Sequence, residues 1–363
     1  MVIFIPLVMG TQPKVLIMGA GLIGLSTAYA LQKQGAEVTI TDARSSAMRG
    51  TSHANSGMIH PSQSRPWIGS GDLSYDSIAA KVVLELAQDS RKSVMKNVQA
   101  LNLTEISERP SGCYQIYPNM TEVRVAQQIY NALGIESVTV MDVVKTAGHI
   151  ALYFPNDHSG NAYDYGVALQ KYLKSEGAVF IYEADDLILR RGQKGITAQL
   201  KGHVFQCDHV VVCAGPQSPD ILKTLGLKLF LENSRGFAVD FARPDIELPD
   251  CPLMEVEARS TLTVLGETLR LSGTMNEASA RPLLQRWFSL APDIMKRLSP
   301  ARKIWSGLRP VSVTGRPIIS PTSIKGLWVN TGHGHMGWTL SAGSGDLMAD
   351  MILHGRVDNR FQL

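Results

Sequence analysis

Runs of hydrophobic residues, separated by glycine and polar turns, divide the chain into predicted strands and helices, most clearly near its start. Residues 15–18 form a short apolar run with β-branched members, which is typical of a buried parallel strand. Residues 25–34 have a helical pattern that ends at Gly35, a common helix stop. Residues 36–41 predict a second strand, so the chain begins with a strand, a helix and a strand.

The same patterns predict the elements that follow. Helices are predicted at 73–102, 122–133, 165–174, 281–298 and 338–353. Strands are predicted at 112–117, 178–182, 186–189, 196–200, 209–213, 236–241, 261–265, 268–272 and 327–330. A strand that leads into a glycine turn therefore occurs at the start, the middle and the end of the chain, which indicates a discontinuous domain with another domain inserted.

This order of elements predicts an α/β protein of two domains, which its 363 residues also favour. The first is a Rossmann-like, discontinuous dinucleotide-binding domain, expected at 14–80, 150–225 and 301–363. The second is an inserted α+β domain built on an antiparallel or mixed sheet, expected at 81–149 and 226–300.

A GxGxxG turn, Gly19 to Gly24, joins the first strand to the first helix. Its first glycine permits the tight turn, its second lets the backbone approach a pyrophosphate, and its third allows close packing of helix on strand. Asp42 stands 18 residues past Gly24, where an acid would bind the ribose hydroxyls of an adenine nucleotide. These features predict a dinucleotide site. The alternative, an uncharged membrane span over 15–31, is disfavoured by the three glycines and by a length that divides into strand and helix.

The amino-acid composition limits which kinds of molecule and which cell compartment are expected for this protein. The low charged fraction of 18% beside 44% hydrophobic residues suits a large, well-buried enzyme, and a net charge of +3 without a basic run disfavours nucleic acid. The four cysteines have no CxxC spacing, so neither a metal site nor a disulfide framework is expected, and a reducing, cytoplasmic compartment is favoured. Residues 1–9 are apolar, but Pro6 interrupts them and a signal peptide's basic start is missing. No integral membrane segment is predicted.

Five further features carry a resemblance to a known family. They are the glycine turn with Asp42 and the segments 51–57 (TSHANSG), 211–215 (VVCAG), 305–310 (WSGLRP, with GRP at 315–317) and 330–334 (NTGHG). Together they resemble the D-amino-acid oxidase family of flavoproteins, and the resemblance covers nearly the whole chain. Within that family, residues 330–352 are most similar to the bacterial D-amino-acid dehydrogenases of the small-subunit type, and glycine oxidase is a neighbour that shares the GLRP block.

The resemblance implies that the cofactor is FAD, held in a Rossmann-like domain of the glutathione-reductase type. Asp42 would hold the adenosine ribose and Arg44 would lie along the adenine. Residues 334–339 would face the N1 and O2 edge of the flavin, where a helix N-terminus stabilises the anionic reduced form. The predicted cofactor contacts are Gly19, Ala20, Gly21, Leu22, Ile23, Gly24, Asp42, Ala43, Arg44, Thr51, Ser52, Asn55, Ser56, Gly57, Met58, Leu187, Ala214, Gly215, Gly307, Gly334, His335, Met336, Gly337, Trp338 and Thr339.

Arg309, in the GLRP block, is the residue predicted to bind the substrate. An arginine buried in an apolar strand end requires an anion, and a bidentate pair with a carboxylate would hold the substrate Cα–H over flavin N5. A structural salt bridge is the alternative. His335 stands where some relatives carry a second carboxylate-binding arginine, so it would bind the substrate or pack near the flavin. His333 is expected at the flavin edge or as a structural residue, and no chemistry is assigned to His53 and His60.

The implied activity is FAD-dependent oxidative deamination of D-amino acids to 2-oxo acids and ammonia, by hydride transfer from the α carbon to flavin N5. Two departures leave the substrate open: the region after Trp67 is short, and strand 259–263 lacks the tyrosine that relatives place over the substrate. The alternatives are oxidation of glycine, sarcosine, proline-like or opine-like amines, a subunit of a multi-subunit amine dehydrogenase, and a nicotinamide dehydrogenase. The expected electron acceptor is oxygen, a quinone or a partner subunit. A quinone would add peripheral contact with the inner membrane.

Overall fold

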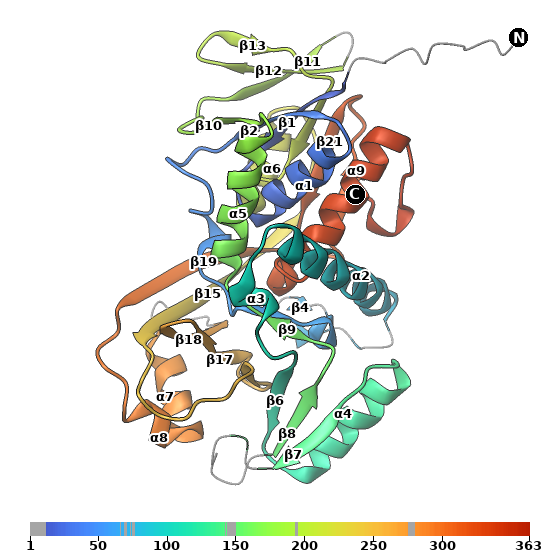
Figure 1. Ribbon diagram of the computed structural model, residues 1–363. Coiled ribbons are helices and arrows are strands. Elements are labelled where there is room, and N and C mark those ends of the chain that lie inside the picture. Colours follow the sequence, from blue (N-terminus) through green and yellow to red (C-terminus); the bar gives the residue numbers. More distant parts are fainter. Residues whose placement is uncertain are drawn as a thin grey trace, which may run out of the picture.

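The computed structural model describes residues 12–65, 67, 68, 71, 72, 74, 77–141, 143, 150–192, 195–274 and 280–363. These residues form an α/β protein with a six-stranded and an eight-stranded sheet. In the view of Figure 1 the six-stranded sheet and its helices lie above, and the eight-stranded sheet lies below. The long strands β15 (Leu231–Ala242) and β19 (Lys303–Ser312) reach from one part to the other. The predicted α/β fold class is confirmed.

The six-stranded sheet has the order β10-β2-β1-β14-β21-β20. Its first five strands are parallel, and β20 runs antiparallel to β21. The strands are β10 (Val179–Ile181), β2 (Glu37–Thr41), β1 (Lys14–Met18), β14 (His209–Val212), β21 (Leu327–Thr331) and β20 (Ile318–Pro321). Strands from the start, middle and end of the chain are therefore neighbours, as the three glycine turns predict.

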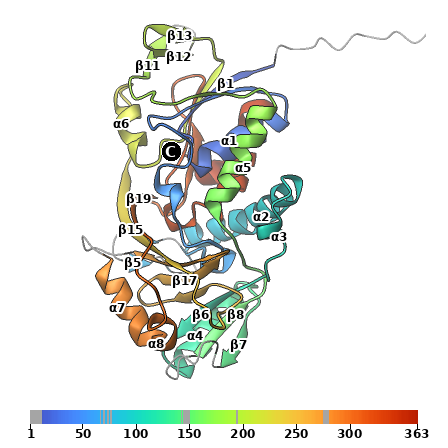
Figure 2. The ribbon, with the colours of Figure 1, turned by 60° about the vertical axis from the view of Figure 1, so that its left-hand side comes forward.

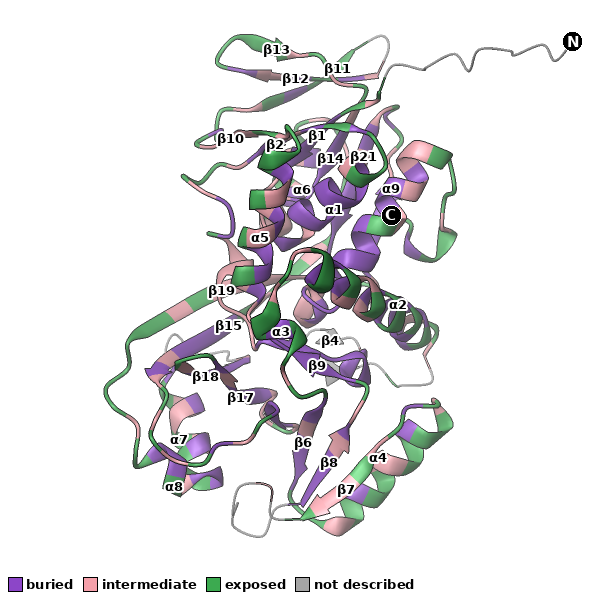
Figure 3. Cartoon of the chain, viewed as in Figure 1, coloured by how far each residue is buried: buried purple, intermediate pink, exposed green. Residues whose placement is uncertain are grey.

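Helices α1 (Leu22–Lys33), α5 (Ala162–Ser175) and α9 (Ser341–His354) pack together over this sheet. Most residues of α1 are buried, as the purple colour in Figure 3 shows, so its hydrophobic residues surround the helix and form no single stripe. Small residues permit this close packing. A Cβ at Gly345 of α9 would lie 2.6 Å from the Ser26 carbonyl oxygen of α1.

The eight-stranded sheet has the order β19-β15-β18-β17-β16-β6-β8-β7. Every neighbouring pair is antiparallel except β16 and β6, which are parallel. Besides β15 and β19 it contains β18 (Thr268–Thr274), β17 (Ser260–Leu265), β16 (Leu253–Glu255), β6 (Cys113–Tyr117), β8 (Ile150–Phe154) and β7 (Val138–Met141).

The two faces of this sheet differ because side chains alternate along each strand. One face carries Phe237, Val239 and Leu271, which pack with Trp287 under α7 (Arg281–Leu290) and α8 (Pro292–Met295). Figure 2 shows these two helices beside the sheet. We call the other face the polar face. It carries Gly236, Ala238 and Asp240 of β15 opposite Thr274, Ser272 and Arg270 of β18, with Thr261 and Thr263 of β17 alongside.

The remaining elements surround these two sheets. A three-stranded antiparallel sheet is formed by β11 (Ile188–Gly192), β12 (Gly195–Leu200) and β13 (His203–Phe205). Two short pairs are β3 (Met58–Ile59) with β9 (His158–Ser159), and β4 (Trp67–Ile68) with β5 (Gly71–Asp72). The other helices are α2 (Ile78–Ala100), α3 (Thr104–Ser107), α4 (Met120–Ala132) and α6 (Ser218–Lys223).

Most predicted elements are present, with ends displaced by a few residues. The single helix predicted at 281–298 is wrong, because α7 ends at Leu290 and Pro292 begins the separate helix α8. The last helix begins at Ser341, three residues later than predicted, because a 3₁₀ turn at Gly334–Met336 precedes it. Residues 73, 75 and 76, at the start of the helix predicted at 73–102, lie outside the described residues.

Three segments pack with one sheet although the predicted domain boundaries assign them to the domain of the other sheet. Helix α2, expected in the inserted domain from residue 81 on, packs against α9 beside the six-stranded sheet. Strands β8 and β19, expected in the dinucleotide-binding domain, belong to the eight-stranded sheet. The division of the chain into domains stays a prediction. An apolar run specifies a strand but not the sheet that the strand joins.

Candidate functional site

The GxGxxG turn adopts a backbone that only glycine permits. Gly19 has φ +111°, and a Cβ on it would lie 2.5 Å from the carbonyl oxygen of Cys213 at the end of β14. A Cβ on Gly24 would lie 1.8 Å from the Gly19 carbonyl oxygen. The first glycine therefore allows the turn to approach the neighbouring strand, and the third allows α1 to start directly above β1.

The first turn of α1 presents backbone N–H groups that the protein leaves open. Gly21 caps the helix without a side-chain hydrogen bond, and the first turn contains no acidic residue. The Leu22 N–H donates to Ser52 Oγ at 3.1 Å. Within the described residues, the N–H groups of Ile23 and Gly24 have no protein acceptor. Open N–H groups at the positive end of a helix form an anion site.

Asp42 lies beside this turn at the end of β2. Its Oδ2 accepts the Ala20 N–H at 2.8 Å and its Oδ1 accepts the Arg44 N–H at 2.8 Å. Each carboxylate oxygen has a second lone pair, so Asp42 can also accept ribose hydroxyls. The exposed Arg44 guanidinium lies 3.8 Å from Oδ1, and Ala43 is exposed between the two residues.

Leu187 lies in a turn that is tied to Asp42. The Ala184 N–H donates to the Asp42 carbonyl oxygen at 3.0 Å, and the Leu187 N–H donates to the Ala184 carbonyl oxygen at 3.3 Å. The predicted adenine contact is therefore near the predicted ribose ligand.

The loop at 51–58 connects the glycine turn to the eight-stranded sheet. The Thr51 hydroxyl donates to the Leu308 carbonyl oxygen of β19 at 2.6 Å, and a Cβ on Gly307 would lie 3.4 Å from Thr51 Cα. The Thr263 hydroxyl on the polar face donates to the Ser56 carbonyl oxygen at 2.7 Å. Asn55 Oδ1 accepts the Gly57 N–H at 2.9 Å, and Gly57 has φ +78°. Met58 follows as a buried residue of β3.

The C-terminal glycine turn meets the same loop from the other end. The His60 N–H donates to Thr339 Oγ1 at 3.1 Å, which ties residue 60 to the turn. The side chains of Met336 and Trp338 are buried in the core beside α1, so they offer only backbone to a cofactor. His333 is buried, and its Nε2 lies 2.8 Å from Ser344 Oγ.

The turn after β14 is the third glycine turn beside this region. The Thr331 hydroxyl donates to the Gly215 carbonyl oxygen at 3.4 Å, which joins the ends of β14 and β21. Gly215 has φ +58° and Gly334 has φ +55°, while Ala214 and Gly337 keep part of their surface exposed. The predicted residues of all three turns therefore lie at the same edge of the six-stranded sheet.

Arg309 projects from β19 onto the polar face. Its Nη1 donates to Thr274 Oγ1 at 2.8 Å and its Nη2 donates to the Gly273 carbonyl oxygen at 3.5 Å. The guanidinium covers Gly236, where a Cβ would lie 2.5 Å from Arg309 Cζ. Enclosure by protein lowers the pKa of Arg309 to about 10, although part of its surface stays accessible. In the described part of the chain no carboxylate pairs with Arg309, so the expected alternative of a structural salt bridge has no partner there.

His335 lies near Arg309 as a neutral imidazole. Its Nε2–H donates to the Gln63 carbonyl oxygen at 3.0 Å, because a carbonyl can only accept. Burial, then the neighbouring His60, then the positive charges of Arg309 and Arg259 hold the pKa of His335 well below its usual range. The ring centroids of His60 and His335 are 6.2 Å apart. The structure therefore brings the two predicted catalytic residues to one place.

Comparison with known proteins identifies the family. A sequence model of the DAO family, described as FAD dependent oxidoreductase, matches residues 14–351. The chain belongs to the DAO family of FAD-dependent oxidoreductases. The DAO-family relatives include the D-amino acid dehydrogenases of Xanthobacter autotrophicus (29% identical) and Vibrio atlanticus (26% identical), and each comparison covers 93% of this chain and 95% of the relative.

Solved structures share the fold. Glycine oxidase from Geobacillus kaustophilus superposes with a TM-score of 0.82 at 21% identity, over 97% of this chain and 99% of the oxidase. Iminodiacetate oxidase from Chelativorans sp. BNC1 gives a TM-score of 0.80 at 18% identity, over 96% and 98% of the two chains. Helices long and apolar enough to cross a membrane do not occur among the residues that the structure describes.

The cofactor of the DAO family is FAD, and the residues of this chain fit it. The open N–H groups of Ile23 and Gly24 suit a pyrophosphate, and the lone pairs of Asp42 suit a ribose. The glycines at 19 and 24 keep the cradle free of side chains.

A buried hydrogen-bond chain next to His335 escaped the sequence predictions. Gln63 Nε2 donates to the Tyr130 hydroxyl at 3.4 Å, and the Tyr130 hydroxyl donates to Gln115 Oε1 at 2.9 Å. Gln115 Nε2 then donates to Ser62 Oγ at 3.2 Å, and Ser62 Oγ donates to Asp157 Oδ2 at 2.5 Å. The donors all point toward Asp157, which also accepts the Ser62 N–H. The chain fixes Ser62 and Gln63, and through the Gln63 carbonyl it fixes His335.

Burial raises the pKa of Asp157 to about 7, although the hydrogen bonds from Ser62 favour the charged form. In the sequence, Asp157 lies in Asn156-Asp157-His158-Ser159-Gly160, which has the composition of an ordinary turn. Nothing local distinguishes it, because its side-chain hydrogen-bond partner, Ser62, lies 95 residues away in the sequence.

Proposed function

We propose that this protein oxidises D-amino acids to 2-oxo acids and ammonia, with FAD as the oxidant. The observation that carries the proposal is Arg309, an enclosed cation on the polar face without a carboxylate partner among the described residues. A buried arginine of this kind is stabilised by an anion, and the substrate carboxylate would supply it through two parallel hydrogen bonds.

The neighbours of Arg309 support its role as the carboxylate anchor. Thr274 and the Gly273 carbonyl oxygen each occupy one terminal nitrogen, which orients the planar fork. The absence of a side chain at Gly236 lets the guanidinium lie flat against β15, where a Cβ would be 2.5 Å from Arg309 Cζ. The anchor would then fix the substrate Cα relative to the cofactor, which is the main requirement for transfer of its hydrogen.

His335 is proposed as the second substrate-facing residue. With its proton on Nε2, held by the Gln63 carbonyl oxygen, its Nδ1 carries a lone pair. Its low pKa keeps it neutral at physiological pH, so it would add no charge that repels the substrate ammonium group. The buried chain that ends at Asp157 would hold this tautomer in place.

Bound FAD would accept two electrons and a proton equivalent, as hydride, from the substrate Cα after the amine has lost one proton. The imino acid released would hydrolyse in water to a 2-oxo acid and ammonia. The predicted cofactor contacts are retained as the proposed FAD site, with Asp42 at the ribose and the N-terminus of α1 at the pyrophosphate. The proposed domains are an FAD domain around the six-stranded sheet, now including α2, and a substrate domain around the eight-stranded sheet, now including β8 and β19.

The D-amino acid is favoured because curated relatives with that activity in their names span nearly the whole chain. A second candidate is glycine or a secondary amine, because proteins named glycine oxidase, iminodiacetate oxidase and L-proline dehydrogenase share the fold. The acceptor that reoxidises the flavin is proposed to be oxygen, a quinone or a partner subunit, and a quinone would place the protein at the inner membrane.

Anaerobic mixing of the FAD-bound protein with single substrates tests the proposal. D-alanine, D-methionine and D-phenylalanine should bleach the flavin and yield one 2-oxo acid and one ammonia per flavin reduced, while their L-enantiomers should not. Bleaching by glycine, sarcosine or L-proline alone would favour the second candidate. Protein that binds FAD but is bleached by none of these amines would refute both.

A further inference from the structure

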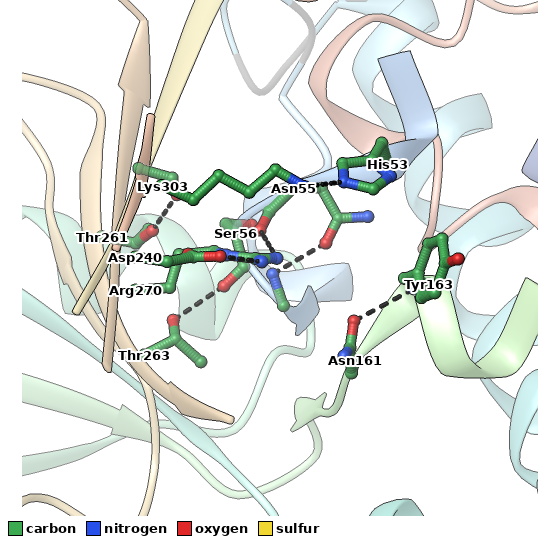
Figure 4. Close-up of polar contacts among 12 residues, drawn as sticks. His53, Asn55, Ser56, Asn161, Tyr163, Asp240, Thr261, Thr263, Arg270 and Lys303 are labelled. Carbon is green, nitrogen blue, oxygen red and sulfur yellow. Dashed lines mark hydrogen bonds and ion pairs between the residues drawn. The ribbon is translucent and has the colours of Figure 1, made fainter. Parts of the chain in front are cut away.

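A polar cavity borders the loop at 51–57, and its lining residues are not among the proposed FAD and substrate contacts. It has a volume of about 370 Å³ and lies between the loop at 51–57, the start of α5 and the polar face near the ends of β15, β18 and β19. Figure 4 shows its polar contacts. Three cations, Arg49, Arg270 and Lys303, line it together with one carboxylate, Asp240. None of these four residues belongs to the predicted cofactor or substrate contacts.

Arg270 is already neutralised within the cavity wall. Its Nε and Nη2 donate to the two oxygens of Asp240 at 2.6 and 2.8 Å, and its Nη1 donates to the Asn55 carbonyl oxygen at 3.3 Å. The positive charge of Arg270 also favours the charged form of Asp164, in the first turn of α5, although burial raises the pKa of that carboxyl overall. Arg270 therefore has a structural role, which is to join the polar face to the loop at 51–57.

Lys303 has a neutral partner. Its Nζ–H donates to His53 Nε2 at 2.7 Å, so that nitrogen is the acceptor and the His53 proton lies on Nδ1, where it donates to the Met48 carbonyl oxygen at 3.2 Å. Burial, and then the charge of Lys303, lower the pKa of His53, which keeps the ring neutral. No carboxylate among the described residues pairs with Lys303, so its charge stays uncompensated.

Arg49 is the second uncompensated cation. Its Nε donates to the neutral Ser46 hydroxyl at 3.0 Å, and none of the described carboxylates forms an ion pair with it. The opposite wall is the start of α5, where Asn161 Oδ1 accepts the Tyr163 N–H at 3.1 Å and where the acidic Asp164 stands in the first turn. The Tyr163 ring lies edge-on to His53, with centroids 5.1 Å apart.

We propose that this cavity binds a small oxyanion, a phosphate or a carboxylate, between Arg49 and Lys303. Its volume lies within the range of small-molecule sites. An anion there would gain charge-assisted hydrogen bonds from two cations that form no ion pair with a described carboxylate. Because Lys303 contacts His53 and Arg270 contacts Asn55, binding would act on the loop at 51–57, whose other contacts are proposed to hold the cofactor.

Isothermal titration calorimetry on the FAD-saturated protein tests the site, since FAD then fills the proposed pyrophosphate cradle. Inorganic phosphate and succinate are the two probes, and the tighter one identifies the class of oxyanion. Lys303→Gln and Arg49→Gln should each weaken binding of that probe on the order of tenfold or more. Lys303→Arg, which retains the charge, should keep most of the affinity. Lys228→Gln, an exposed charge change elsewhere, is the control and should have no effect.

Two results would overturn the proposal. One is that neither probe binds wild-type protein that is folded and carries FAD. The other is that the Lys303 and Arg49 variants, folded as judged by circular dichroism, bind with wild-type affinity, which would indicate an adventitious ion only. Because the calorimetric signal does not depend on any substrate, its outcome is separate from that of the proposed amine oxidation.

Discussion

Replacement of Arg309 distinguishes a substrate anchor from a structural arginine. Arg309→Ala removes both terminal nitrogens that the structure orients through Thr274 and Gly273. Each charge-assisted hydrogen bond contributes about 1.5–3 kcal/mol, so the loss of two corresponds to a fall in kcat/KM of about 10² to 10⁴. Because Arg309 makes no ion pair with a described carboxylate, its removal leaves no buried acid uncompensated and should cost little stability.

Arg309→Lys is the matched control for charge. Lysine keeps the positive charge but loses the planar fork, so the substrate carboxylate can tilt. A displacement of about 1 Å can reduce the rate on the order of a hundredfold. The lysine variant should therefore recover substrate affinity in part while its rate of flavin reduction stays low.

Stopped-flow bleaching of the flavin under anaerobic conditions measures this reductive step alone. Rates at increasing concentrations of D-alanine separate the limiting rate from the apparent affinity, and thermal unfolding and FAD content confirm that each variant is intact. Bleaching by Arg309→Ala at a near-native rate and affinity would refute the anchor. A variant that loses stability while its folded fraction reacts normally would point instead to a structural role.

Further predictions concern the cofactor site and the buried acid. Asp42→Ala should raise the dissociation constant for FAD by about tenfold or more, measured by titration of apoprotein, while Asp42→Asn retains part of the affinity. Gly24→Ala should abolish FAD retention or folding, because its Cβ would lie 1.8 Å from a carbonyl oxygen, whereas Gly50→Ala, whose nearest neighbour is 3.5 Å away, should be tolerated. For Asp157 the unfolded chain releases its proton near pH 3.8 and the folded chain near pH 7, so its contribution to the free energy of unfolding should fall as pH rises between these values, by on the order of 4 kcal/mol. Chemical denaturation at pH 5 and pH 8 covers about two pH units of this range and should show a fall of about 2.7 kcal/mol in the wild type, and none from this group in Asp157→Asn.

The nucleotide end of the site was predictable because its determinants are local. Strand, glycine turn, helix and Asp42 lie within 29 residues from Lys14, and the geometry of each glycine follows from the turn itself. The long helices were predictable for the same reason, except where Pro292 divides α7 from α8, whereas the short helices α3 and α6 were not predicted. Their period of 3.6 residues is contained in one continuous stretch of chain.

The substrate end depends on contacts between distant segments, which one sequence does not contain. Strand β19 was not predicted because Gly307 and Pro310 interrupt its pattern of alternating residues. The proline is tolerated because β19 lies at the edge of the eight-stranded sheet. The pairing of Thr274 with Arg309 spans 35 residues, and that of Gln115 with Ser62 spans 53. Asp157 and the cavity at Lys303 therefore become visible only when the strands are assembled.

The alternation along β15 and β18 links these observations to function. The residues at 237, 239 and 241 are apolar and bury the sheet under α7 and α8, so the residues between them lie on the opposite, polar face. On β15 that face carries Gly236, Ala238 and Asp240, and Trp305 of β19 lies beside Ala238. The two proposals use opposite ends of this face, with Arg309 proposed to bind the substrate carboxylate and Lys303 proposed to bind a second anion. One strand, β19, supplies both cations six residues apart, on the same side because six is even.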